Sequence, residues 1–292
     1  MKTVYTLLVL FIIILTCNEI RSQERQPILA ILEAGEAHRI AGVLNKNLDS
    51  AGEVRILDRD QARAAARGTG YSGSFNLSTT EARNLGAAIG CDFFIIYTAD
   101  TLRRSPSTGP AYFESYAWVF MVSARTGKLI RWQHPRFKAA SNEESESLLV
   151  AELASSTVRT NYLQAIRNAV EDERAQQQIT FDRVIPVIEA APDDEASAQA
   201  EGLRLPRPYR RLVPRYPETA AVGEIEGVVD VLVDVDAEGD VNKVEVARWA
   251  GFGLDEAALD TVRQLHFFPA MRDGMPVPMR VLLRYNFRRP LQ

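Results

Sequence analysis

A strict alternation of side-chain character near the C-terminus is the strongest constraint on how this chain of 292 residues can fold. In the run VVDVLVDVD at residues 228–236, valine occupies every second position from Val229 to Val235. Aspartate or leucine occupies the positions between them. Because successive side chains of a β-strand point to opposite faces of the sheet, this pattern predicts a strand with one apolar, buried face.

The residues after this strand predict a hairpin, a helix and one more strand. Ala237-Glu238-Gly239 is a turn signal, and a second apolar run follows at residues 241–246. Apolar side chains then recur at helical spacing through LDEAALDTVRQL, and the alternation returns between Met279 and Phe287. The order strand, strand, helix, strand predicts a small C-terminal α+β domain.

The last predicted strand presents two different faces. We expect its inward face to be formed by Val281, Leu283, Tyr285 and Phe287. We expect Leu282, Arg284 and Asn286 to point outward, because they occupy the alternate positions.

These segments together resemble the C-terminal domain of the TonB energy-transducer family. The resemblance extends over VPRYPETA, IEGVVDVLVDVDAEGDV, LDEAALDTVRQLHFFPA and RVLLRYNF. Its landmarks occur in the order of the family: Tyr216-Pro217, Gly227, Gly239, Leu254-Asp255 and Phe268-Pro269-Ala270.

The resemblance implies a sheet with one helix packed on it and an exposed edge at the last strand. In the family, a short segment of an outer-membrane transporter adds to that edge as an extra strand, so that main-chain hydrogen bonds supply affinity. The implied partner-binding residues are Arg280, Leu282, Arg284 and Asn286 on the last strand, with Arg215, Tyr216 and Pro217 before the first.

The N-terminus has the layout of a signal peptide. Lys2 precedes an apolar run, Val4 to Leu15, which is shorter than the roughly twenty residues of a spanning helix. We expect residues 1–22 to be removed by cleavage after Ser22 and the protein to be periplasmic. Two alternatives stay open: a retained inner-membrane anchor, with membrane association, and a lipoprotein processed at Cys17.

Energy transducers of the TonB family carry a histidine in a membrane-embedded N-terminal helix, followed by a long proline-rich spacer. The apolar run of this chain contains no histidine, and no proline-rich run follows it. The sequence therefore favours peptide binding at a sheet edge and gives no support to force transmission.

Between the leader and the C-terminal domain, short apolar runs alternate with helical segments, which predicts an α/β domain at residues 23–178. We expect four to five strands with flanking helices, including a helix capped by Asp58, another capped by Ser78 or Thr79 with Glu81 in its first turn, and a long helical pattern at residues 143–178. The acidic, small-residue stretch APDDEASAQAEG predicts a linker at residues 179–204, before a C-terminal domain at residues 205–292.

The N-terminal domain is similar to the α/β domain of curli-secretion lipoproteins and penicillin-binding-protein activator lipoproteins. The residues that carry this resemblance are Asp58-Arg59, Gly86, Gly90, Asp92 and the turn Arg125-Thr126-Gly127-Lys128. The resemblance implies a cell-envelope accessory domain without catalysis.

Composition and spacing argue against several other classes of function. The net charge of −4 argues against a nucleic-acid binder. The three histidines lie far apart, without metal-site spacing, and we expect no metal, no cofactor and no enzymatic activity. Loss of Cys17 with the leader would leave Cys91 alone, and we interpret Cys91 as a buried structural thiol.

The sequence thus predicts a periplasmic TonB-like binding protein that engages an outer-membrane transporter or other envelope partner by β-strand addition, in TonB-dependent transmembrane transport. The alternative is an envelope structural or regulatory protein that acts in cell-wall synthesis or secretion assembly. An exposed edge would also permit a strand-exchanged homodimer.

Overall fold

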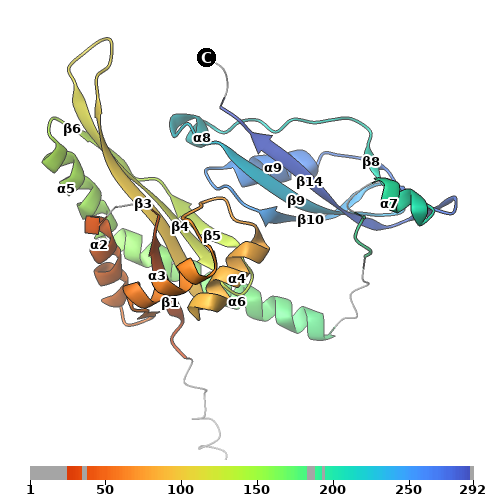
Figure 1. The fold of residues 1–292 in the computed structure, drawn as a ribbon, viewed down its shortest axis with the longest axis horizontal. Coiled ribbons are helices and arrows are strands. Elements are labelled where there is room, and N and C mark those ends of the chain that lie inside the picture. Colours follow the sequence, from red (N-terminus) through yellow and green to blue (C-terminus); the bar gives the residue numbers. More distant parts are fainter. Residues whose placement is uncertain (1–24, 35–37, 183–187, 193–194, 290–292) are drawn as a thin grey trace, which may run out of the picture.

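The computed structural model describes residues 25–34, 38–182, 188–192 and 195–289 (Figure 1). The expected signal peptide and Cys17 lie outside the described residues. Among the described residues, no helix combines the length and apolar character needed to cross a membrane.

The N-terminal half is built on a six-stranded sheet in the order β2-β1-β3-β4-β5, with β6 paired to the first part of β4. Strands β2, β1 and β3 are parallel to one another, whereas β3, β4 and β5 form antiparallel pairs. The bounds of these strands are β1 Ile28–Glu33, β2 Arg55–Ile56, β3 Phe93–Arg104, β4 Tyr112–Ser123, β5 Leu129–Gln133 and β6 Arg136–Ala139.

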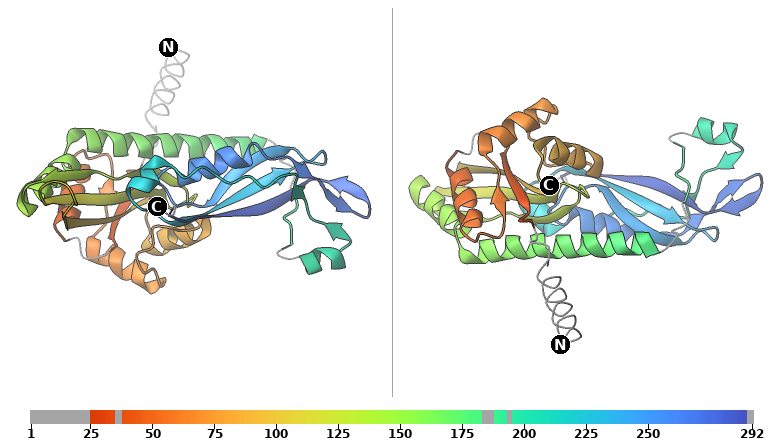
Figure 2. Two further views of the ribbon diagram at one scale, coloured as in Figure 1. Left: turned by 90° about the horizontal axis from the view of Figure 1, so that it is seen from above. Right: turned by 90° about the horizontal axis from the view of Figure 1, so that it is seen from below.

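Helices cover both faces of this sheet. One face packs against α2 (His38–Asp49), α5 (Asn142–Leu153) and α6 (Ser156–Asp182). The other packs against α3 (Arg59–Gly68) and α4 (Thr79–Ile89). Helix α6 is the longest, and Figure 2 shows that it extends beyond the N-terminal sheet.

Local capping explains where these helices begin. The Asp58 carboxylate accepts a hydrogen bond from the amide of Gln61, and Ser78 and Glu81 form a complete capping box, as expected. The single helical pattern expected at residues 143–178 is instead two helices. The Ser155 hydroxyl accepts the amide of Val158, which starts α6 as a separate helix.

The C-terminal half contains the predicted strand, strand, helix, strand order, so the mixed α+β class is confirmed. Its antiparallel sheet has the order β10-β9-β14, and the inward valines of β9 are fully buried in a cluster with residues of α9. The bounds are α8 Glu218–Val222, β9 Gly227–Val235, β10 Val241–Arg248, α9 Leu254–Val262 and β14 Met279–Phe287. Five short strands complete this half: β7 Leu203–Arg204, β8 Arg207–Pro208, β11 Phe267–Phe268, β12 Ala270–Arg272 and β13 Met275–Val277.

The segment expected to be an unpacked linker is partly ordered. It contains the end of α6, helix α7 (Glu195–Ala200) and strand β7. Ala198 is buried against Leu203, Ala270 and Met279. Small side chains suggested an unpacked linker. At Ala198, however, the small side chain lets the short helix α7 pack against β7 and β12.

A single apolar core joins the two halves of the molecule. Phe94 and Phe120 from the N-terminal sheet belong to the same buried cluster as Val231, Trp249 and Leu254 from the C-terminal half. The C-terminal domain therefore packs against the sheet face that α3 and α4 leave uncovered.

Candidate functional site

The two outer strands of the C-terminal sheet, β10 and β14, are its two edges. An edge strand carries main-chain N–H and C=O groups that no neighbour has paired, so each edge is a template for another strand. The surroundings of the two edges therefore decide where a partner strand could add.

The end of β10 is closed by the N-terminal domain. Ser78 forms an antiparallel bridge with Arg248, and the amide of Trp249 donates to the carbonyl of Leu77 at 3.2 Å. The Arg248 guanidinium donates to the carbonyl of Asn76 at 2.8 Å and lies 3.0 Å from the Glu81 carboxylate. The segment before α4 thus pairs alongside the end of β10 and extends the C-terminal sheet at that point.

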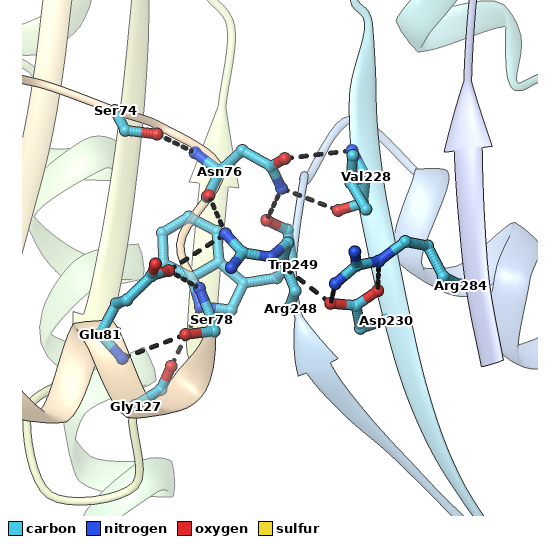
Figure 3. A network of polar contacts seen from close by, with 10 residues as sticks. All are labelled: Ser74, Asn76, Ser78, Glu81, Gly127, Val228, Asp230, Arg248, Trp249 and Arg284. Atoms are coloured by element: carbon cyan, nitrogen blue, oxygen red, sulfur yellow. Dashed lines mark hydrogen bonds and ion pairs between the residues drawn. The ribbon is translucent and has the colours of Figure 1, made fainter. Parts of the chain in front are cut away.

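One amide side chain, that of Asn76, ties this segment to two strands of the C-terminal domain (Figure 3). Its Nδ2 donates to the carbonyls of Val228 at 2.8 Å and Trp249 at 2.6 Å, and its Oδ1 accepts the amide of Val228 at 3.0 Å. Buried main-chain groups without partners are costly. Asn76 therefore satisfies three part-buried main-chain groups at the point where the two domains meet.

Trp249 is the apolar centre of the same contact. It is 1% exposed, its ring centroid lies 5.7 Å from that of Phe120, and its Nε1 donates to the carbonyl of Gly127 at 3.0 Å. Gly127 has φ of 71°, and a Cβ there would lie 1.9 Å from the carbonyl oxygen of Thr79. Only glycine can place this carbonyl within hydrogen-bonding distance of the indole N–H.

Phe252 extends this contact from the loop between β10 and α9. Its ring is 2% exposed and lies 5.1 to 5.4 Å from the rings of Trp118, Phe120 and Trp132. The loop itself is held by Asp255, whose carboxylate accepts the amides of Ala250 at 2.8 Å and Gly251 at 3.0 Å. Burial nevertheless raises the pKa of Asp255 to about 6.

The opposite edge, β14, pairs continuously with β9 from Met279 to Phe287. At its first part, the amide and the carbonyl of Arg280 both point away from β9, since they bond to Glu189 and Ala191. Main-chain groups alternate in direction along a strand, and the register with β9 has no shift. The amides and carbonyls of Leu282, Arg284 and Asn286 therefore also face the outer edge.

Beyond Arg280, no strand among the described residues pairs with this outer edge. Leu282 is 51% exposed, and Arg284 and Asn286 are also exposed, while Met279 and Phe287 are buried at the two ends of the strand. The alternation of facing expected from the sequence is thus present in the structure.

Two of the expected contact side chains are held by aspartates of β9. Arg280 makes a bidentate pair with Asp234 at 2.5 and 2.8 Å, and Arg284 makes one with Asp230 at 2.7 and 2.9 Å. Hydrogen bonds to these carboxylates raise the pKa of both arginines. The guanidinium groups thus brace the sheet, and the free polar groups of the edge are mainly those of the main chain.

The remaining expected contact residues, Arg215, Tyr216 and Pro217, lie near the far end of β14. The Tyr216 hydroxyl donates to the carbonyl of Ile225, and its ring lies 6.4 Å from that of Phe287. Pro217 occupies the N-cap position of α8 without a side-chain hydrogen bond, and Arg215 is exposed. Tyr216 and Pro217 therefore have packing roles, whereas the exposed Arg215 makes no ion pair among the described residues.

Sequence reasoning missed the residues that close the edges: Asn76 and Trp249 at β10, and Glu189 to Ala191 at β14. Asn76 lies in a polar loop, NLST, where its only sequence signal is proximity to a helix cap. Trp249 follows an alternating strand and carries no motif. The structural role of both residues depends on contacts between segments more than 100 residues apart.

Comparisons with known proteins show what the C-terminal half is similar to. Residues 213–288 match the family model described as Gram-negative bacterial TonB protein C-terminal. Protein TonB of Vibrio cholerae serotype O1 is 36% identical over 76 residues, which are 26% of this chain and 31% of that protein. Protein TonB of Xanthomonas campestris pv. campestris is 36% identical over 75 residues, which are 25% of this chain and 34% of that protein. The chain thus spans about a third of the length of these relatives.

Two solved structures are also similar in part. The TonB C-terminal domain of Pseudomonas aeruginosa is 23% identical, with a TM-score of 0.26, covering 30% of this chain and 89% of that one. The LpoB C-terminal domain of Salmonella enterica is 12% identical, with a TM-score of 0.27, covering 42% of this chain and 90% of that one. From the family match and the sequence relatives, residues 213–288 are a TonB C-terminal domain.

Proposed function

We propose that this protein is a cell-envelope binding protein that captures an extended segment of an outer-membrane transporter, or of another envelope partner, along the outer edge of β14. The incoming segment would become a fourth strand of the β10-β9-β14 sheet. The role is that of a binding protein without catalytic chemistry.

One observation supports this proposal above the others: the outer side of β14 already accepts an extended main chain at Arg280. The same geometry repeats at Leu282, Arg284 and Asn286, where the side of the strand is exposed. At the opposite edge, the N-terminal domain pairs with the end of β10 at Ser78 and also contacts its middle through the Lys128–Glu245 ion pair, so we place strand addition at β14.

The chemistry of this edge favours recognition through the partner's main chain. Arg280 and Arg284 each direct two guanidinium N–H groups at Asp234 and Asp230, respectively, which holds both side chains against β9, and Leu282 between them is an exposed apolar contact. We expect the partner's side chains to contribute an apolar residue opposite Leu282, with affinity set by the ladder of main-chain bonds. We propose that the protein is exported to the periplasm, where it can meet such a partner.

Photocrosslinking from position 282 of the full-length protein tests this function. With a photoreactive amino acid in place of Leu282, the native bacterium should yield a covalent adduct with an outer-membrane β-barrel transporter, identified by mass spectrometry. An adduct with a cell-wall synthase or a secretion component would instead favour the structural or regulatory alternative.

A pair of substitutions at residue 284 shows whether the main chain carries the binding. Arg284→Pro removes an N–H that faces the outer edge without removing a bond to β9, whereas Arg284→Ala removes the ion pair and keeps that N–H. The adduct should be lost in Arg284→Pro and retained in Arg284→Ala. Equal yields from the two variants would contradict strand addition.

A further inference from the structure

The outer edge of β14 is not free along its whole length, because a segment of this chain occupies its beginning. Ala190 forms a parallel bridge with Arg280. The amide of Arg280 donates to the carbonyl of Glu189 at 2.8 Å, and the amide of Ala191 donates to the carbonyl of Arg280 at 2.7 Å. Residues 189–191, here called the linker rung, therefore already make the contact that an added strand would make.

The linker rung is held weakly by its side chains. The Glu189 carboxylate lies 2.7 Å from the Arg272 guanidinium, but both side chains are well exposed, at 48% and 38%. Exposed ion pairs contribute little because water and salt screen them. Ala191 adds a small apolar contact beside Met279 at the start of β14.

The pairing also stops after one residue of β14. Arg280 is the first of four residues whose main-chain groups face outward, followed by Leu282, Arg284 and Asn286. No hydrogen bond between the linker rung and Leu282 is present in the described chain. The rung thus covers one pairing position and leaves three.

We infer that the linker rung is a built-in competitor for the partner strand: residues 189–191 occupy the first pairing position of β14 and must leave before a partner can pair with the whole edge. This inference rests on the proposed function of β14 and adds its regulation. A partner that pairs at all four positions displaces the rung, since it forms several main-chain bonds where the rung forms two.

The size of the effect follows from the population of the open edge. When only a fraction of molecules is open, the apparent dissociation constant rises by the inverse of that fraction. The rung makes two main-chain hydrogen bonds, and at a net value of somewhat under about 1 kcal/mol each they correspond to an opening constant that lowers affinity by roughly tenfold. Removing the rung should therefore tighten partner binding by about tenfold.

Two proline substitutions in the full-length chain distinguish loss of the linker rung's pairing from a general effect of proline in this segment. Ala191→Pro deletes the N–H that bonds to Arg280 and sets the pyrrolidine ring against the Arg280 carbonyl, so the whole rung should leave. Ala190→Pro, one residue earlier, deletes an N–H that makes no hydrogen bond in the described chain. Both changes lie in an extended segment at the surface, and the two variants are matched in chemistry.

The first measurement needs no partner. By NMR hydrogen exchange, the amide of Arg280 should be protected in the native chain and in Ala190→Pro, and should exchange at least about tenfold faster in Ala191→Pro. Equal exchange of Arg280 in all three proteins would overturn the inference.

The second measurement uses outer-membrane extract as the probe and the crosslink from position 282 as the readout. The adduct should reach half its maximal yield at about tenfold less extract with Ala191→Pro than with the native chain or Ala190→Pro. An unchanged midpoint, with Arg280 already released, would overturn the competitor role. If no extract protein crosslinks to the native chain or to either variant, the proposed function itself fails, whatever Arg280 shows.

Discussion

The two edges of the C-terminal sheet are closed by different physical means. At β10, the N-terminal domain buries Trp249 and Phe252 and satisfies main-chain groups through Asn76. At β14, two main-chain bonds to the linker rung and one exposed ion pair cover only the first position. Burial makes the first closure part of the fold, whereas the second can open at small cost. The contrast shows how one sheet can have a permanent edge contact and an exchangeable one.

The strongest test of this contrast is Trp249→Ala. Losing a fully buried indole and its bond to Gly127 should lower the free energy of unfolding by about 3–5 kcal/mol. Urea denaturation followed by circular dichroism measures the change. Phe268→Ala is the control, because Phe268 is 58% exposed and should cost less than about 1 kcal/mol. Similar losses of unfolding free energy from both variants would show that the contact at Trp249 stabilises the fold no more than an exposed side chain does.

Asn76→Ala should have the next largest effect. It leaves both main-chain groups of Val228 and the carbonyl of Trp249 without their partner, which should cost about 2–4 kcal/mol. Hydrogen exchange should show faster loss of the Val228 amide proton. Asn286→Ala, at an exposed position of β14, should change neither quantity. Unaltered protection of Val228 in Asn76→Ala would remove this residue from the closure.

The loop that carries Phe252 should respond to pH through Asp255. Burial raises the pKa of this carboxyl from 3.8 to about 6 in the folded state, so between these values the folded protein holds a proton that the unfolded chain has released. Stability should therefore fall as pH rises from 4 to 6, by about 2–3 kcal/mol, and stay level above that.

The control for this pH effect is Asp255→Asn, which cannot titrate. Urea denaturation at pH 4, 5, 6 and 7 gives the difference between the two proteins. The native chain should lose stability relative to Asp255→Asn over that window. A relative gain would mean that the amides of Ala250 and Gly251 outweigh burial at this carboxylate.

The smallest effects should come from the arginines that brace β14. Arg280→Ala leaves the buried Asp234 without another ion-pair partner among the described residues, and should cost about 1–2 kcal/mol. Arg284→Ala leaves Asp230 still 3.4 Å from Arg248, and should cost less than about 1 kcal/mol. Urea denaturation at low and high salt measures both. A larger loss from Arg284→Ala would show that Arg248 does not compensate.

Local sequence signals predicted most of the elements correctly. The alternation in β9 and β14 and the caps at Asp58 and Ser78 all act within a few residues, and each is present in the structure. The division at Ser155 within the long helical pattern was missed, because a serine cap competes with a helix that its neighbours favour. The ordered helix α7 was missed because alanine-rich polar sequence also suits a linker.

The candidate site was predictable only in part. Which residues of β14 face outward follows from the period of two, so Leu282, Arg284 and Asn286 could be named from sequence. Their surroundings could not, because the partners of Arg280 and Arg284 lie on another strand and the linker rung reaches β14 from nearly 90 residues away. Such contacts have no local signature.

The sequence alone therefore determined a strand, strand, helix, strand domain whose last strand alternates apolar and polar positions, since those features arise from side-chain periodicity along the chain. Only the tertiary structure decided which edge of that sheet stays available. Asn76 and Trp249 close the end of one edge and the linker rung covers the start of the other because folding brings distant segments together. Burial of Trp249 and Phe252 makes the first closure part of the fold, whereas the second depends on two main-chain bonds and is exchangeable.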